Sequence, residues 1–208
     1  MKNTQANLEM NYDAIVVGTG ITGGWAAKEL CEKGLKTLVL DRGRMVKHRE
    51  DYPTMDKDTW DLPNNNQLSR EEKKNYLKQS RVGWAPNEDT KHFFVNDLEH
   101  PYQETKRFDW IRGYHVGGRS LTWGRQSYRW SDIDFEANLK EGIAVDWPVR
   151  YKDIAPWYDK VETYIGVSGE KLGLRQLPDG QFQPPMDLTC PEEDLKTAMA
   201  EKFEDNRV

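Results

Sequence analysis

Residues 14–41 read AIVVGTGITGGWAAKELCEKGLKTLVLD, and the order of strand, turn and helix signals in this stretch decides the fold. The apolar runs 14–17 and 37–40 are short and contain β-branched residues, which is typical of strands buried on both faces. Between them, apolar side chains recur at helical spacing over residues 21–33, and Gly34 follows as a stop signal. The pattern predicts a βαβ unit and therefore an α/β fold with a parallel sheet.

The turn after the first predicted strand has glycines at the spacing GxGxxG. The first glycine allows the tight bend, the second lets the backbone approach a pyrophosphate, and the third lets helix and strand pack closely. A pyrophosphate is favoured at the helix N-terminus by free N–H groups and the helix dipole. Asp41 follows the second strand at the spacing of a carboxylate that accepts hydrogen bonds from ribose. The candidate residues of this dinucleotide site are Gly18, Gly20, Ile21, Thr22, Gly23, Asp41 and Arg42.

Simpler interpretations of this turn stay open. A βαβ unit can form without binding any ligand, and Asp41 can be a surface turn residue. The motif also does not separate NAD from FAD. A nicotinamide-binding domain with a regulatory or redox-sensing role is therefore an alternative.

A second glycine-rich segment, residues 112–125, reads RGYHVGGRSLTWGR. The Gly117-Gly118 pair is costly in backbone entropy, so it is expected where the chain passes close to a ligand. A plain glycine turn is the alternative interpretation. The segment resembles the first signature of the glucose–methanol–choline (GMC) oxidoreductases. In that signature Arg-Gly, Gly-Gly and a serine precede a short stretch against the flavin ring.

Together with the N-terminal motif and the segment 146–158, the resemblance spans about residues 11–168. It implies a Rossmann-like FAD-binding fold with a separate substrate region. Carried onto this chain, the first glycine motif holds the FAD pyrophosphate and Asp41 holds the adenosine ribose. The residues of the second cluster that the resemblance places against FAD are Gly117, Gly118, Ser120, Leu121, Thr122, Trp123 and Gly124. Within that cluster, residues 121–124 run beside the reactive edge of the isoalloxazine.

Trp123 stands where many family members have asparagine. This variant resembles the sugar-oxidising branch, which includes pyranose oxidases and the large subunits of gluconate, fructose and glucoside dehydrogenases. Pyranose oxidases attach their flavin through a histidine just before that tryptophan. Thr122 occupies the position here and cannot form that bond, so we expect non-covalent FAD. His115 lies on the other side of the glycines, and we expect it to be structural.

The resemblance implies an FAD-dependent oxidoreductase that acts on CH–OH groups. The leading hypothesis is a sugar or glycoside dehydrogenase that transfers hydride from the substrate alcohol to flavin. Its implied partners are a small sugar or alcohol, an electron acceptor such as a quinone or a haem subunit, and a small export partner. An oxidase that produces hydrogen peroxide and a non-catalytic dinucleotide-binding module remain alternatives.

The catalytic residues are unknown from this sequence. In the family, a histidine paired with another histidine or an asparagine accepts the hydroxyl proton, and it lies near the C-terminus, beyond Val208. The histidines of this chain are His48, His92, His100 and His115, and none stands in a matching motif. The chain stops where another strand is expected. We therefore expect a fragment that is inactive alone.

The composition excludes several other functions. The 208 residues have a net charge of -5 and no basic stripe, which argues against nucleic acid as a partner. Cys31 and Cys190 lack partners at metal-ligand spacing, so no metal site is expected, and Cys31 is expected to be buried on its helix. No apolar run reaches the roughly 18 residues of a membrane span. With no signal-peptide pattern, the expected location is cytoplasmic, or periplasmic where a partner bears the signal.

The predicted organisation is a flexible N-terminus (1–10), the FAD-binding βαβ unit (11–43), an insertion or lid (44–106), a flavin-contacting segment (107–150) and a helical segment (151–208). The insertion is rich in Pro, Asn and Asp. Its aromatic residues, among them Phe93 and Phe94, favour an ordered lid or subunit contact over disorder. We expect helices near residues 69–80, over 153–165 and over 191–203.

Overall fold

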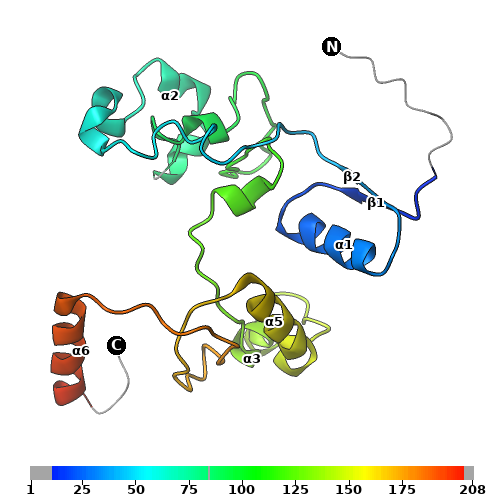
Figure 1. Ribbon diagram of the computed structural model, residues 1–208, viewed down its shortest axis with the longest axis vertical. Helices are drawn as coiled ribbons and strands as arrows, with labels where there is room; N and C mark the ends of the chain where they lie inside the picture. The colour runs from blue at the N-terminus through cyan, green and yellow to red at the C-terminus, as the bar shows by residue number, and fades with distance from the viewer. Residues whose placement is uncertain (1–10, 84, 204–208) are drawn as a thin grey trace. The chain divides into compact units, whose positions relative to one another are not determined.

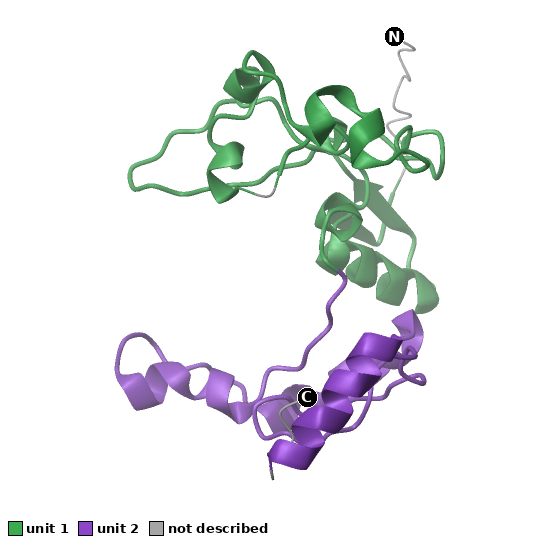
Figure 2. Ribbon diagram, turned by 90° about the vertical axis from the view of Figure 1, so that its left-hand side faces the viewer, with its two compact units in different colours: residues 1–124 green, residues 125–208 purple. Residues whose placement is uncertain are grey.

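The computed structural model describes residues 11–83 and 85–203, so the predicted flexible N-terminus, residues 1–10, lies outside the described residues. The chain divides into two compact units, Met1–Gly124 and Arg125–Val208 (Figure 2). The boundary falls inside the predicted segment 107–150. Both glycine-rich segments therefore supply their glycine clusters to the first unit.

The first unit contains the predicted βαβ arrangement (Figure 1). Strand β1 (Ala14–Val17) and strand β2 (Thr37–Leu40) pair in parallel, with Ala14 opposite Thr37 and Val17 opposite Leu40. Helix α1 (Ile21–Glu32) connects them. The prediction of a mixed α/β structure with a parallel sheet is confirmed at this level, because a parallel pair needs such a crossover.

The expectation that both strands are buried on both faces is wrong. Ile15 is 62% exposed and Val17 is 83% exposed, whereas Val16 between them is buried. Successive side chains of a strand point to opposite faces, and α1 packs on the face that carries Val16. The opposite face is left open by the described residues. Cys31 is likewise exposed, not buried as expected, because two strands are too narrow to cover the helix.

The insertion is ordered but has little regular structure. The predicted helix near residues 69–80 is wrong in length, because α2 spans only Glu72–Asn75 and the helical conformation breaks at Tyr76. The backbone N–H groups of Lys78 and Gln79 donate to the Asp97 carboxylate at 3.1 and 3.4 Å. A tertiary contact thus overrides local helix preference. The short 3₁₀ turns of this unit are η1 (Thr59–Asp61), η2 (Pro63–Asn66), η3 (Gln79–Val82), η4 (Lys91–Phe93) and η5 (Gly118–Leu121).

Aromatic residues of the insertion form the core of the first unit. Phe93 and Phe94 are buried together with Ala85. The partly buried side chains packed on them are Val46, Tyr52, Tyr76 and Ile111. Ile111 directly precedes the second glycine-rich segment, so the insertion packs against the chain that leads into that segment.

The second unit is mainly helical. The helices are α3 (Asp132–Phe135), α4 (Ala137–Glu141), α5 (Tyr151–Ile165) and α6 (Cys190–Lys202). The predicted helices over residues 153–165 and 191–203 are confirmed as α5 and α6 to within a few residues. Buried Arg129 ties the start of this unit to α5, since its Nε donates to Glu162 at 2.8 Å. In residues 11–83 and 85–203, every helix is too short or too polar to cross a membrane.

Candidate dinucleotide-binding site

The N-terminus of α1 offers unpaired backbone donors. The helix begins at Ile21, directly after the glycine turn, with Gly20 as its N-cap residue. Among the described residues, no side chain caps this end, and the first helical turn contains no acidic residue. The first N–H groups of a helix have no intrahelical partner, and the helix dipole makes this end positive. Ile21 and Thr22 are exposed here, so the geometry suits an anion such as a phosphate.

Gly23 sets how closely α1 approaches β1. A Cβ atom at this position would lie 2.0 Å from the carbonyl oxygen of Gly18 and 3.5 Å from Cγ1 of Val16. Only glycine therefore fits without moving the backbone. A Cβ atom on Gly20 would meet no described atom within 4 Å, so this side of the turn is open to a ligand.

Asp41 lies at the end of β2, close to the same turn. Its Oδ2 accepts from the backbone N–H of Thr19 at 2.8 Å and also from the Thr19 hydroxyl. Its Oδ1 accepts from the backbone N–H of Gly43 at 2.9 Å. The Thr19 hydroxyl and the Gly43 amide hold the pKa of Asp41 below its ordinary value. The carboxylate is thus ionised at neutral pH, and its exposure lets ribose hydroxyls donate to it.

The structure brings the two glycine clusters together. The backbone N–H of Gly117 donates to Oγ1 of Thr19 at 2.9 Å, across 98 positions of sequence. Gly118 has a positive φ of 52°, and a Cβ atom on it would lie 3.3 Å from Cα of Gly20. The glycine turn at residues 18–23 and the Gly117-Gly118 turn, both expected to contact one ligand, are adjacent in the fold.

The remaining predicted residues of the second cluster follow in and after η5. The Ser120 hydroxyl donates to the carbonyl of Gly117, and Leu121 packs on the same glycine. The N–H of Thr122 donates to the carbonyl of Arg119 at 3.0 Å. Trp123 is half-buried and Gly124 is exposed at the end of the first unit.

Two side chains next to these clusters have other contacts. The guanidinium of Arg42 lies 3.7 Å from the ring centroid of Tyr114, a cation–π contact. His115 is only 4% exposed and meets Phe93 edge-on at 5.9 Å. Burial lowers the pKa of His115, so its imidazole is neutral at pH 7. The structural role expected for His115 stays a prediction.

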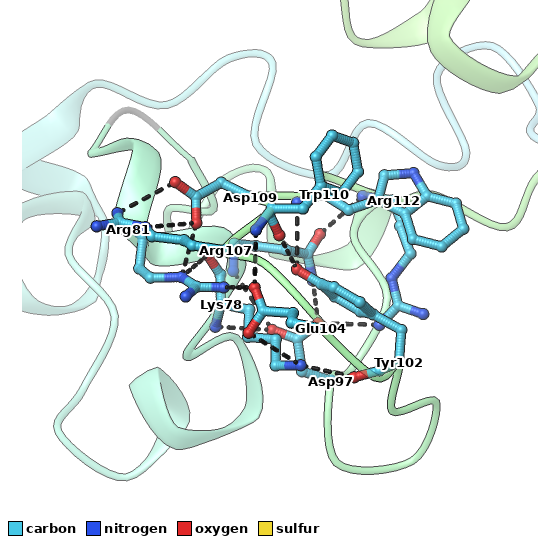
Figure 3. Close-up of polar contacts among 11 residues, drawn as sticks. Lys78, Arg81, Asp97, Tyr102, Glu104, Arg107, Asp109, Trp110 and Arg112 are labelled. Atoms are coloured by element: carbon cyan, nitrogen blue, oxygen red, sulfur yellow. Dashed lines mark hydrogen bonds and ion pairs between the residues drawn. The ribbon is translucent and has the colours of Figure 1, made fainter.

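A buried polar cluster, which we call the Arg112 cluster (Gln79, Asp97 and Arg112), holds the chain that leads into the second glycine cluster. Figure 3 shows Asp97 and Arg112 of this cluster. The Arg112 guanidinium donates to Asp97 at 3.0 Å, and the Arg112 backbone N–H donates to the Gln79 carboxamide at 3.0 Å. Gln79 in turn donates to the carbonyl of Val95 at 2.5 Å, and the Val95 N–H donates to the Arg112 carbonyl at 2.9 Å. No local sequence pattern singles out Gln79 or Asp97, because their partners lie far away in the chain.

Partly exposed side chains form a layer around the Arg112 cluster, namely Arg81, Tyr102, Glu104, Asp109 and Trp110. The rings of Tyr102 and Trp110 lie 4.9 and 5.3 Å from the Arg112 guanidinium (Figure 3). Arg81 pairs with Glu104 at 2.6 Å and lowers the pKa of Glu104 to about 2. The insertion is also joined to the segment before Gly117, because Arg81 pairs with Asp109 at 2.8 Å.

Comparison with known proteins identifies relatives of this chain, although no protein-family model matches it. The chain is 27% identical over 187 residues to the fructose dehydrogenase large subunit of Gluconobacter japonicus, covering 88% of this chain and 32% of that protein. It is 29% identical over 190 residues to the gluconate 2-dehydrogenase flavoprotein of Pantoea cypripedii, covering 83% of this chain and 28% of that protein. For the oxygen-dependent choline dehydrogenase of Xanthomonas axonopodis pv. citri, the identity is 28% over 157 residues, 75% of this chain and 24% of that protein.

The chain thus spans a third or less of the length of the curated relatives it matches. The structure places the two glycine clusters side by side. These relatives are GMC-type oxidoreductases, and over most of its own length this chain is homologous to that family.

Proposed function

We propose that this chain supplies the dinucleotide-binding part of an FAD-dependent oxidoreductase with a Rossmann-like fold. The observation that carries the proposal is the contact between the two glycine clusters, made by the hydrogen bond from Gly117 to Thr19 beside the uncapped end of α1. A single ligand with a pyrophosphate, a ribose and a flavin ring would use both clusters at once.

The residues present fit FAD. The N–H groups at the start of α1 and the open side of Gly20 would receive the pyrophosphate, and Asp41 would accept hydrogen bonds from the adenosine ribose. Gly117, Gly118 and Ser120 would line the pyrophosphate and ring, and residues 121–124 would run beside the isoalloxazine. When bound, FAD supplies the acceptor for a hydride. The chain's own residues bind and orient it.

The proposed reaction is oxidation of a CH–OH group in a sugar or glycoside. It is supported by relatives named fructose dehydrogenase large subunit and gluconate 2-dehydrogenase flavoprotein. The first name describes one subunit of a dehydrogenase, which supports a separate electron-accepting partner such as a quinone or a haem subunit. Thr122 cannot form the covalent bond to flavin that a histidine at this position forms, so we propose that FAD is held non-covalently.

An oxidase is the second candidate. It is supported by the match to the paromamine 6'-oxidase of Streptomyces fradiae, 24% identical over 165 residues. Peroxide formation in step with substrate oxidation under air would favour the oxidase. Turnover with a quinone but not with oxygen would favour the dehydrogenase.

FAD binding by the natural full-length protein tests the proposal. We expect tight binding that is released by acid, weakened strongly by Gly118→Val and left unchanged by the exposed substitution Thr163→Val on α5. Bleaching of the flavin by fructose, gluconate or a glucoside then tests the substrate class. A protein that binds no FAD would overturn the proposal, and yellow colour retained in an acid precipitate would overturn the non-covalent linkage.

A further inference from the structure

Thr19 occupies a variable position of the GxGxxG motif, and the motif assigns it no role. In the structure its side chain is half-buried between the end of β2 and the turn before η5. Three of the chain's hydrogen bonds meet at this residue, counting its backbone N–H. It is the residue through which Asp41 and Gly117 are connected.

The two bonds of the Thr19 hydroxyl run in opposite directions. The hydroxyl donates its one proton to Oδ2 of Asp41 and accepts from the backbone N–H of Gly117 at 2.9 Å. A hydroxyl has one donor and two lone pairs, so donation to the carboxylate leaves its oxygen free to accept from Gly117. The ionised Asp41 therefore fixes the orientation in which Thr19 can hold Gly117.

Gly117 is held on both sides. Its N–H contacts Thr19, while its carbonyl accepts from the Ser120 hydroxyl and from the Ser120 N–H, the latter at 3.2 Å. The residue has a φ of 93°, which places it in the left-handed region open to glycine. The start of η5 is thus set by Thr19 from one direction and by Ser120 from the other.

We infer that Thr19 is a positioning residue that couples the ribose-binding carboxylate of Asp41 to the Gly117-Gly118 turn, so that both halves of an FAD site take up their geometry together. This inference rests on the proposed FAD function. A hydroxyl is required for both bonds, so serine can replace threonine. Valine has nearly the same shape but leaves the Gly117 N–H unpaired and removes one hydrogen bond from Asp41.

The test compares Thr19→Val, Thr19→Ser and Thr163→Val in the natural full-length protein. FAD dissociation constants are measured by flavin fluorescence, with thermal unfolding recorded for each apoprotein. We expect Thr19→Val to weaken FAD binding about 10- to 100-fold, the fold-change expected for losing a charged and a neutral hydrogen bond. Thr19→Ser stays within about threefold of the wild type, because the hydroxyl keeps both partners. Thr163→Val matches the wild type.

Two readouts on the apoprotein do not depend on FAD. By NMR, the pKa of the Asp41 carboxyl rises toward its ordinary value in Thr19→Val, because the hydrogen bond that lowers it most is gone. Amide exchange at Gly117 becomes faster in the same variant and stays slow in Thr19→Ser. If the wild type binds no FAD, the proposed function fails, and these two readouts still decide whether Thr19 couples Asp41 to Gly117.

Several results would overturn the inference. Equal FAD affinity in Thr19→Val and the wild type would do so, as would equal losses in the serine and valine variants. A lowered unfolding temperature with unchanged FAD affinity would show that Thr19 stabilises the fold without positioning the site. An unchanged Asp41 pKa together with unchanged Gly117 exchange would remove the contact on which the inference is built.

Discussion

Two polar clusters hold the chain around the second glycine cluster, and they differ in burial. The Thr19 cluster (Thr19, Asp41 and Gly117) is open to solvent, with an exposed carboxylate at its centre. In the Arg112 cluster, the side chains of Arg112 and Asp97 are 4% and 6% exposed. Water reaches the exposed carboxylate of the first cluster but not the buried ion pair of the second. We therefore expect substitutions in the Arg112 cluster to lower the free energy of unfolding more than substitutions in the Thr19 cluster.

The largest loss in the free energy of unfolding is expected for Asp97→Ala. This change leaves the Arg112 guanidinium buried without its anion, and breaking a buried pair in this way costs about 3–5 kcal/mol in the free energy of unfolding. Urea unfolding measures it. The control is Asp109→Ala, which removes a partly exposed carboxylate bonded to Arg81 in the neighbouring layer (Figure 3). Equal losses in the two variants would contradict the contrast between buried and exposed clusters.

The next effect is expected for Gly23→Ala. The new methyl group would lie 2.0 Å from the Gly18 carbonyl oxygen, so α1 must move away from β1. We expect a loss of about 1–3 kcal/mol in the free energy of unfolding, as for other overpacked sites, together with weakened FAD binding. Gly24→Ala is the matched control. A methyl group there meets no described atom within 4 Å, and alanine is a better helix former, so stability should not fall.

A smaller effect is expected for the pH dependence of FAD binding through Asp41. The folded-state pKa of Asp41 is lowered, first by the Thr19 hydroxyl and then by the Gly43 amide. FAD binds to the folded protein, so the carboxylate contributes while it is ionised, and this contribution is lost as the pH falls through the lowered folded-state pKa. FAD titrations should show constant affinity from pH 7 to about pH 5. At lower pH the FAD affinity of the wild type should fall as Asp41 is protonated, and in Asp41→Asn this fall should be absent. If the fall persists in Asp41→Asn, another group causes it.

The smallest effect is expected at a surface ion pair. Lys74 contacts Glu71 at 3.0 Å beside the short helix α2, and both side chains are mostly exposed. Exposed pairs of this kind contribute little, because water solvates both charges and their ordering costs entropy. Lys74→Ala should leave thermal unfolding and FAD affinity unchanged. A clearly lower unfolding temperature or FAD affinity would show that the exposure of a polar contact does not by itself predict how much the contact contributes.

Local sequence patterns were sufficient to predict the strands and the helix that form the candidate site. The strand β1, the helix α1 and the strand β2 follow from apolar periodicity and glycine positions within residues 14–41, and α5 and α6 follow from helical spacing and start signals. Neighbouring residues decide such elements, so a single sequence contains the information. The same holds for both glycine clusters, whose residue types are visible without their partners.

Contacts between residues far apart in the sequence determined the features that the local pattern did not predict. Tyr76 ends α2 early because Asp97, about twenty residues further on, takes the backbone N–H groups that follow. Ile15 and Val17 were expected to be buried from their apolar character, yet exposure depends on what packs against their face. The Thr19 hydroxyl contacts Asp41 and Gly117 only in the folded chain, because these partners lie 22 and 98 positions further along the sequence. Burial and hydrogen-bond pairing between remote segments are properties of the folded chain, whereas turns and periodic elements are properties of neighbouring residues.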